Sequence, residues 1–390
     1  MAYLGMTSPA LYQQAIRSGG VAISYTVDAL FDGSPVAGAT DLRPVAGSIV
    51  DTAKPGVRRT LTCTFAPQPG LYDLLAPAGV LLRATANVRL THRDTVTIPM
   101  GVFDVDRQSI SDGGGGVTLT APDKWRRIQR ARFIQPYPSE KGNTVTGQIT
   151  LLIKGALGMG EPVITRTTNM TRVGAMTWEQ DRDKAILELA ESIGCWVYFD
   201  RDGVATIADL PRSIRAADWI VDASANGVLL SAERSRSREN TSNVVVVSSS
   251  ASEGEKFPPQ IVWDDDPSSP TYAGTDPIMN PSSAGPFGLV PYYFDTPILT
   301  TVEAARRAGR TILSRTRGLA SQVSLGQVPN PAVDAMDALD VLPPRERYDT
   351  PRVLERHVAD TVTHPLALDS PQNIEGRSTR TEDIEAGLTV

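Results

Sequence analysis

Alternation of apolar and polar residues marks several segments near the start of the chain. The segments with this period are residues 21–27, 58–65, 81–90 and 95–98. A period of two places every second side chain on the same face of a pleated sheet. Residues 1–120 are therefore predicted to form a first antiparallel, barrel-like β domain, with a short helix over residues 8–18.

Four consecutive glycines, Gly113–Gly116, follow a strand-like segment and allow two interpretations. A phosphate-binding loop needs a helix that starts at the glycines, with Lys followed by Ser or Thr at a set distance. Residues 117–120 instead read Val-Thr-Leu-Thr and alternate like a strand. The glycines are therefore predicted to form the tip of a β-hairpin.

The period changes to that of helices after residue 120. Thr120 can act as the N-cap and Asp123 can complete a capping box, which predicts a helix over residues 125–132. Residues 144–157 have the composition of a second helix. We expect both helices to belong to a domain different from the preceding strands.

A third helix and a hairpin complete this part of the chain. Thr177 with Gln180 has the spacing of a capping box, and residues 186–193 carry an apolar stripe at helical spacing. Residues 195–207 alternate on both sides of a glycine turn, as a hairpin does. Residues 121–222 are therefore predicted to be an inserted α+β domain that packs helices on a hairpin.

Strand-like segments return in residues 223–346. The predicted strands are residues 229–234, 243–248, 323–328 and 339–342. Residues 251–298 show no period, which predicts a long loop. Residues 300–303 are expected to cap a helix that ends near residue 317. This part is predicted to be a second barrel-like β domain, before C-terminal strands and a tail over 347–390. The fold class is therefore α+β and mainly β, with two antiparallel barrel-like domains, an inserted helix-plus-hairpin domain and a C-terminal β segment.

Composition narrows the class of protein. The 390 residues include 32 glycines and 29 prolines, which suits short strands joined by turns. The net charge of −6 disfavours tight binding to a nucleic-acid backbone, while a wall that DNA passes without adhering remains compatible. Cys63 and Cys195 lie in apolar strand-like segments and are expected to be buried thiols, with a disulfide as the alternative.

Targeting signals are not evident in the sequence. Apolar runs stay below the roughly 18 residues of a membrane-spanning helix. Residues 1–5 lack the basic and apolar regions of a signal peptide. The chain is therefore expected to be made in the cytoplasm and not exported by the usual route.

The three histidines, His92, His357 and His364, are candidate metal ligands. In a helix, His357, Asp360 and His364 would share one face. The alternation of apolar residues around them, and Pro365 directly after, favour a strand in which His357 and His364 face opposite sides. A metal site is therefore not predicted there.

Carboxylate pairs and clusters are candidate catalytic or cation-binding groups. Residues 264–266 are three aspartates, but they lack the alternating spacing of a calcium loop and are expected to lie in a solvated loop. The pairs Asp104/Asp106 and Asp200/Asp202 would suit a glycosidase, yet their turn-like settings favour a solvated surface role. A G-x-S-x-G nucleophile motif is also missing. The sequence therefore predicts no catalytic residue, no cofactor and no metal site.

Aromatic and arginine side chains stand out as candidate contacts with partners. Large aromatic residues in a polar loop often anchor an interface, and an arginine-rich helix face suits an acidic protein surface. The candidate contact residues are Trp263, Tyr272, Tyr292, Tyr293, Phe294, Arg306 and Arg310. Stacking of sugar rings on the same aromatic side chains is the competing interpretation.

Four stretches together resemble a known family. They are residues 101–106 with the following glycine turn, residues 185–207, residues 239–246, and residues 304–341 with their Val-Pro-Asn-Pro turn. Their order resembles that of tail hub proteins of long-tailed bacteriophages, which include baseplate hubs and the N-terminal part of tail-associated lysozymes.

The resemblance implies a structural virion protein at the distal tail tip. Three subunits, each with two barrel-like domains, would form a pseudo-sixfold ring that joins the sixfold tail tube to the tip. This homotrimer would surround or close the path of DNA and the tape-measure protein, and would contact the distal tail protein and tip or fibre proteins. The resemblance supplies no catalytic residues. A cell-wall-degrading hydrolase and a carbohydrate-binding tail module remain as alternatives.

Overall fold

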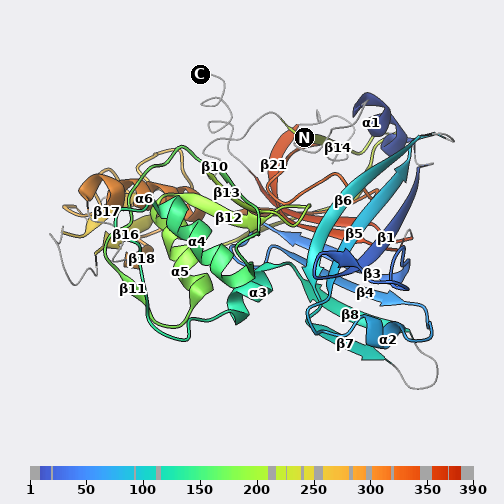
Figure 1. The fold of residues 1–390 in the computed structure, drawn as a ribbon. Coiled ribbons are helices and arrows are strands. Elements are labelled where there is room, and N and C mark those ends of the chain that lie inside the picture. Colours follow the sequence, from blue (N-terminus) through green and yellow to red (C-terminus); the bar gives the residue numbers. More distant parts are fainter. Residues whose placement is uncertain are drawn as a thin grey trace.

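The computed structural model shows an α+β fold made mainly of strands, as the sequence predicts (Figure 1). The structure describes residues 9–18, 21–91, 94–110, 116–209, 217–224, 226–238, 241–249, 258–280, 284–295, 301–317, 320–342, 354–367 and 369–378. The helices are α1 (Pro9–Arg17), α2 (Leu71–Leu74), α3 (Trp125–Arg130), α4 (Val145–Leu157), α5 (Arg182–Ser192) and α6 (Val302–Thr316).

Strands account for most of the remaining structure, and they are spread along the whole described chain. They are β1 (Ala22–Phe31), β2 (Ser34–Pro35), β3 (Pro44–Thr52), β4 (Arg59–Phe65), β5 (Leu81–Arg89), β6 (Thr95–Asp104), β7 (Arg107–Ile110), β8 (Val117–Pro122), β9 (Tyr137–Pro138), β10 (Val163–Arg166), β11 (Thr177–Trp178), β12 (Cys195–Phe199), β13 (Ala205–Asp209), β14 (Trp219–Asp222), β15 (Leu229–Ser237), β16 (Val244–Ser248), β17 (Gln260–Trp263), β18 (Pro291–Asp295), β19 (Ala320–Gln327), β20 (Ala338–Leu342), β21 (Glu355–Pro365) and β22 (Gln372–Ser378).

A ten-stranded sheet unites segments from distant parts of the sequence. Its main order is β15-β19-β22-β21-β3-β4-β8-β7, and β14 and β20 join it beside β21. The central junction is antiparallel and pairs β3 with β21, with Thr52 opposite Thr361. The early and late strand-rich parts of the sequence therefore share one sheet, to which the C-terminal strands β21 and β22 also belong.

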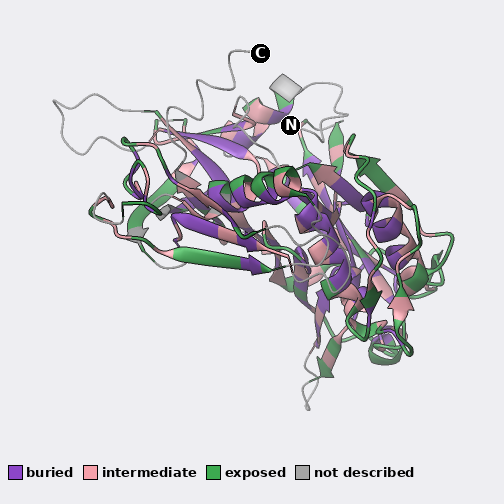
Figure 2. Cartoon of the chain, turned by 90° about the vertical axis from the view of Figure 1, so that its left-hand side faces the viewer, coloured by how far each residue is buried: buried purple, intermediate pink, exposed green. Residues whose placement is uncertain are grey.

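A four-stranded sheet with the order β2-β1-β5-β6 lies against the larger sheet. Between them is the largest hydrophobic core, which includes Ile49, Leu61, Leu82, Phe103 and Leu325, all fully or almost fully buried. Alternation of buried and exposed residues along β4 and β5 agrees with the period of two in the sequence. Figure 2 shows this burial concentrated between the layers.

The strands on either side of the glycine-rich stretch pair with each other, which confirms the predicted hairpin in its described part. β7 and β8 pair antiparallel, with Ile110 opposite Val117. Residues 111–115, the tip itself, lie outside the described residues. Thr120, expected to cap the next helix, instead belongs to β8, because the strand continues to Pro122. The Asp123 side chain accepts a hydrogen bond from the Trp125 backbone N–H at 3.0 Å, at the start of α3.

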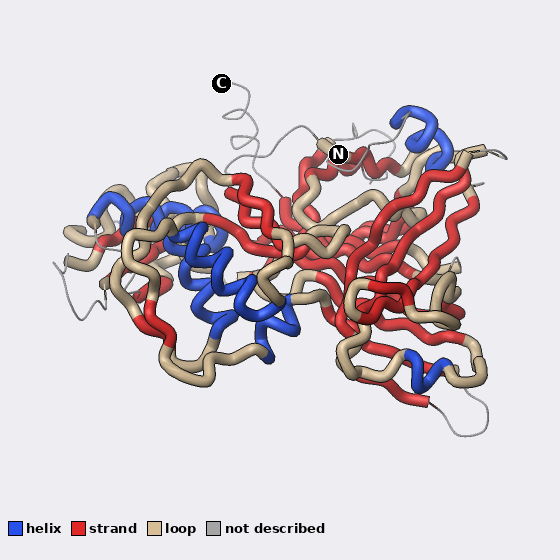
Figure 3. Tube along the Cα trace, in the orientation of Figure 1, coloured by secondary structure: helices blue, strands red, loops and turns tan. Residues whose placement is uncertain are grey.

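The inserted part packs α3, α4 and α5 around a three-stranded sheet, β10-β13-β12 (Figure 3). Its core contains Trp125, Ile149, Ile186 and Phe199. The Thr177 capping box was a wrong prediction. Thr177 belongs to β11, which pairs with β9, and α5 begins only after Asp181.

Tertiary packing explains why Thr177 does not cap a helix. Trp178 is buried and its ring stacks on Tyr137 of β9, with the ring centroids 6.5 Å apart. Tyr137 stacks in turn on Phe133 at 5.1 Å. Stacking of these rings, with Phe133 and Trp178 buried and Tyr137 half-buried, stabilises the extended segment more than one cap would stabilise a helix turn.

A small unit is formed by α6 and the three-stranded sheet β17-β16-β18. α6 packs on β16 and β17, where Val245, Val247, Ala308 and Ile312 form a third core. Thr301 caps α6 by accepting a hydrogen bond from the Ala304 backbone N–H at 3.2 Å, as predicted. The expectation of a structureless loop over residues 251–298 was wrong, because β17 and β18 lie within it.

Candidate functional site

The candidate contact residues lie on the two outer strands, the loop after β17 and the helix of this small unit. Tyr293 of β18 is 74% exposed and Tyr292 is 40% exposed, whereas Phe294 is buried in the core beneath α6. Register pairs Val246 with both Tyr293 and Ile261, so these three side chains share the sheet face turned away from that core. Tyr293 is therefore available to a partner and Phe294 is not.

The other candidate contact residues are less exposed or lie on α6. Trp263 of β17 and Tyr272 in the following loop are half-buried. Arg306 and Arg310 are exposed on α6, and Arg306 donates from Nε to Oε1 of Gln260 at 3.0 Å. The structure thus places the seven residues in one unit of the fold, although on more than one face of it.

Asp104 and Asp106, two of the candidate catalytic carboxylates, are paired with arginines. Asp104 is buried and accepts a hydrogen bond from Arg127 Nε at 3.0 Å. Asp106 pairs with Arg130 and lies 3.3 Å from Arg126 Nε. These pairs fasten β6 to α3, so the expected solvated role is wrong for Asp104.

Asp200 also has a local structural role. Its Oδ1 accepts hydrogen bonds from the Asp202 and Val204 backbone N–H groups, at 3.0 Å and 2.8 Å. These bonds shape the turn between β12 and β13. Desolvation by burial raises the pKa of Asp200, and the Asp202 carboxylate adds to this effect. The geometry is that of a turn, with the two aspartates two residues apart in the same loop.

The acidic cluster and the histidines do not form a metal site in the described part of the chain. Asp264 is fully buried, contrary to the expected solvated loop, because it accepts hydrogen bonds from Ser269 and from Thr271 Oγ1 at 2.7 Å. His364 is also buried, and its Nδ1 lies 2.9 Å from Gln372 Nε2. Burial lowers the pKa of His364 to about 3, so the imidazole is neutral.

The strand predicted around His357 and His364 is confirmed by β21. A bulge at Asp360 changes the alternation between His357 and His364. Their odd spacing therefore no longer places them on opposite faces, as a regular strand would. His357 is paired with Glu355, whose Oε2 lies 3.2 Å from Nε2. His92 lies outside the described residues.

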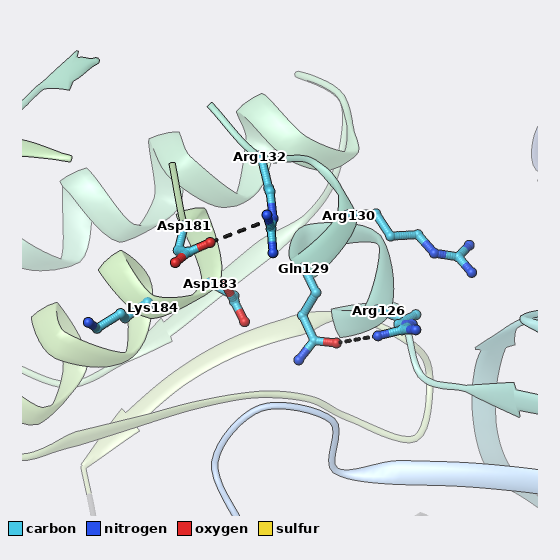
Figure 4. Close-up of a pocket in the computed structure, with 7 residues that line it drawn as sticks. All are labelled: Arg126, Gln129, Arg130, Arg132, Asp181, Asp183 and Lys184. Carbon is cyan, nitrogen blue, oxygen red and sulfur yellow. Dashed lines mark hydrogen bonds and ion pairs between the residues drawn. The ribbon is translucent and has the colours of Figure 1, made fainter. Parts of the chain in front are cut away.

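An open pocket of about 540 Å³ lies between α3 and the start of α5 (Figure 4). Its lining residues are Arg126, Gln129, Arg130, Arg132, Asp181, Asp183 and Lys184. Arg132 lies 3.6 Å from Asp181, and Figure 4 shows Arg130 directed away from this pair. The pocket walls are charged and largely paired with each other or with β6, so they do not form an enclosed substrate site.

A buried charge cluster, absent from the sequence predictions, joins three parts of the chain. Arg201, in the turn between β12 and β13, is 1% exposed. Its Nε donates to Asp334 Oδ1 at 2.8 Å, and its terminal nitrogens donate to the carbonyls of Pro331 and Val333 at 2.6 Å and 3.0 Å. A further bond to the Pro99 carbonyl reaches β6 at 3.2 Å.

Arg58 and Arg59 extend the cluster into the ten-stranded sheet. Both guanidiniums pair with Asp51 of β3, at 2.7 Å and 3.1 Å, and Arg59 also pairs with Asp334 at 2.9 Å. Burial alone would raise the pKa of Asp334, but the Arg201 and Arg59 guanidiniums outweigh it and hold that pKa well below its usual range. The cluster fixes the inserted part to the sheets.

The sequence matches no protein-family model and no curated protein. Solved structures nevertheless share its fold over nearly the whole length. The tail protein from Neisseria meningitidis MC58 is 12% identical with a TM-score of 0.59, and the match covers 91% of this chain and 97% of that one. The 43 kDa tail protein of prophage MuSo2 from Shewanella oneidensis is 13% identical with a TM-score of 0.56, covering 92% and 99%.

A prophage tail protein from Listeria monocytogenes EGD-e is 11% identical with a TM-score of 0.53, and the match covers 93% of this chain and 98% of that one. The chain therefore has the fold of phage tail proteins. The resemblance inferred from the four sequence stretches is confirmed at the level of the fold.

Proposed function

We propose that this chain is a structural tail protein of a bacteriophage. The observation that carries the proposal is the fold likeness to three tail proteins, two of them from prophages, which spans at least 97% of the length of each. A likeness over whole chains is more informative than a shared domain, since tail proteins can carry additional enzymes.

We further propose that three copies form a hub at the distal tip of the tail. In this arrangement the hub joins the sixfold tail tube to the tip and surrounds or closes the DNA path. The distal tail protein, the tape-measure protein and tip or fibre proteins would be its neighbours. The net charge of −6 supports passage of DNA without specific binding, because like charges repel. The domain division at residues 120, 222 and 346 belongs to this proposal.

A structural role, rather than catalysis, is supported by the use of the polar side chains. Asp104 and Asp334 accept hydrogen bonds from arginine side chains, Asp123 accepts one from a backbone N–H, and Asp264 accepts one from the Thr271 hydroxyl. Among the described residues, none of the helices combines the length and apolar character needed to cross a bilayer.

The mass of the native particle tests the hub. Native mass spectrometry of the purified chain should give about three copies, since closed cyclic assemblies are the usual form of symmetric oligomers. Gold-labelled antibody against the chain should mark the distal end of the tail on virions. A particle that stays monomeric at high concentration, or label at another part of the virion, would contradict the hub. Dye-labelled cell wall incubated with the same preparation should release no dye.

A further inference from the structure

One face of α6 carries three arginines that have no carboxylate partner among the described residues. Arg306, Arg307 and Arg310, here called the arginine face, are exposed, and in the described part of the chain none of them has an ion pair. α6 contains a single acidic residue, Glu303. Three neighbouring guanidiniums repel one another, so this surface favours an anionic partner.

A complementary surface lies on the four-stranded sheet and α2. Phe31 and Asp32 end β1 and begin its turn, and Tyr72 and Asp73 belong to α2. Phe31 is 55% and Tyr72 41% exposed, and both aspartates are exposed. These four residues, together with Asp41, are here called the acidic end.

Contacts between loops hold the parts of the acidic end together. The Phe31 ring lies 3.8 Å from the position of a Cβ at Gly79, in the turn after α2. The Leu74 side chain of α2 lies 3.4 Å from the corresponding position at Gly38, in the loop after β2. Asp41 is 69% exposed and its nearest cation is the Arg43 guanidinium at 3.9 Å. The acidic end thus has more carboxylates than cations.

The two surfaces lie at opposite ends of the molecule (Figure 1). α6 is at the left of that view, and β1 and α2 are at the right. They therefore cannot meet within one chain. Because arginine binds carboxylates through paired hydrogen bonds and stacks on aromatic rings, each aromatic–aspartate doublet of the acidic end offers both kinds of contact.

We infer that the arginine face of one copy binds the acidic end of the next copy. The partner surface is present on this same chain, which favours a second copy over nucleic acid or another acidic protein. A contact between two different surfaces joins copies head to tail, and such contacts close into a ring when the rotation between neighbours allows it. The inference rests on the proposed hub, for which it names a contact between subunits.

Charge reversal tests the contact directly. In Arg306→Glu/Arg310→Glu the arginine face becomes acidic, and in Asp32→Lys/Asp73→Lys the acidic end becomes basic. Each variant places like charges opposite one another, so the concentration needed for assembly should rise about a hundredfold by sedimentation velocity. The chain with all four substitutions restores opposite charges at every contact and should assemble again.

A matched control has the same change of charge elsewhere. Arg166→Glu/Arg172→Glu reverses two exposed arginines of the inserted part and should assemble like the wild type. Recovery in the fourfold variant shows that the double variants had not simply unfolded. Assembly should also weaken between about 50 mM and about 500 mM salt, as screening shortens the reach of charges.

The outcomes separate the contact from the hub. Trimers in the wild type and control, with loss in both double variants and recovery in the fourfold variant, support the contact. Trimers in all variants overturn it and leave the hub intact. Failure of the fourfold variant to reassemble also overturns it. A wild type that stays monomeric contradicts the proposed hub itself, and the contact with it.

Discussion

Replacing Arg201 by methionine should destabilise the protein more than any surface substitution. Methionine keeps much of the apolar volume but removes the guanidinium that binds Asp334 and the carbonyls of Pro331, Val333 and Pro99. Breaking a buried ion pair from one side costs about 3–5 kcal/mol. Unsatisfied carbonyls add about 1 kcal/mol each where water cannot reach them, although these terms overlap.

Arg201→Met is expected to lower the free energy of unfolding by about 5 kcal/mol. Arg59 lies 2.9 Å from Asp334 and still compensates part of its charge, which reduces the loss. Calorimetry should show the melting temperature lowered by about 6 °C, because the unfolding entropy of a 390-residue chain is about 0.8 kcal/mol per kelvin. Hydrogen exchange should show faster exchange of the amides at residues 199–204 and 331–337, where the cluster joins the inserted part to the sheets.

Two further variants make the reasoning refutable. Arg201→Lys retains the charge but not the planar set of donors, so it should lie between wild type and Arg201→Met. The Arg132 side chain is 68% exposed and lies 3.6 Å from Asp181. Arg132→Met removes this exposed ion pair and should lower the free energy of unfolding by less than about 0.5 kcal/mol. If Arg201→Met melts within about 1 °C of Arg132→Met, the cluster does not stabilise the junction as described.

Three other predictions concern pH and backbone. Burial lowers the pKa of His364 to about 3. The free energy of unfolding should therefore fall as the pH drops from about 6.5 to about 3. The urea midpoint of His364→Gln should lack the part of this pH dependence that comes from His364. Burial and the neighbouring Asp334 carboxylate raise the pKa of Asp337 to about 7, so the free energy of unfolding should fall as the pH rises from about 4 to about 7. Asp337→Asn should therefore become more stable relative to the wild type as the pH rises through that range. A difference in stability between variant and wild type that stays constant with pH would refute this. Gly203→Ala should cost about 2–4 kcal/mol, because Gly203 has φ 73° and a Cβ would lie 2.6 Å from β6; Gly142→Ala, with φ 84° and open space, should cost about 1 kcal/mol.

Local sequence patterns predicted the elements whose stability is local. The Thr301 cap and the apolar spacing of α6 both act within a few residues, and the structure has the helix where the pattern indicated. The same holds for the hairpin of β7 and β8, where period and glycine turn agree. Where local and tertiary terms compete, as at Thr177, the burial of Trp178 prevailed.

Other features depend on contacts between distant residues and left no local sign. β17 and β18 are short strands whose pairing with β16 is specified by the valines of β16, not by a period of their own. Arg201 looked like an ordinary turn residue, since its partner Asp334 lies far along the chain. The sequence singled out the seven residues as candidate contacts, but only the structure shows that Phe294 is buried and Tyr293 is exposed.

The pairing of β3 with β21 has a consequence for biosynthesis. β3 leaves the ribosome early, and its partner edge is supplied only after almost all of the polypeptide has been translated. Until then the hydrogen-bonding groups along that edge of β3 lack their native partner, which exposes the nascent chain to wrong pairings. Completion of the central sheet is therefore expected to be a late and slow event, and a stop codon before residue 355 should yield an aggregation-prone product instead of a smaller folded one.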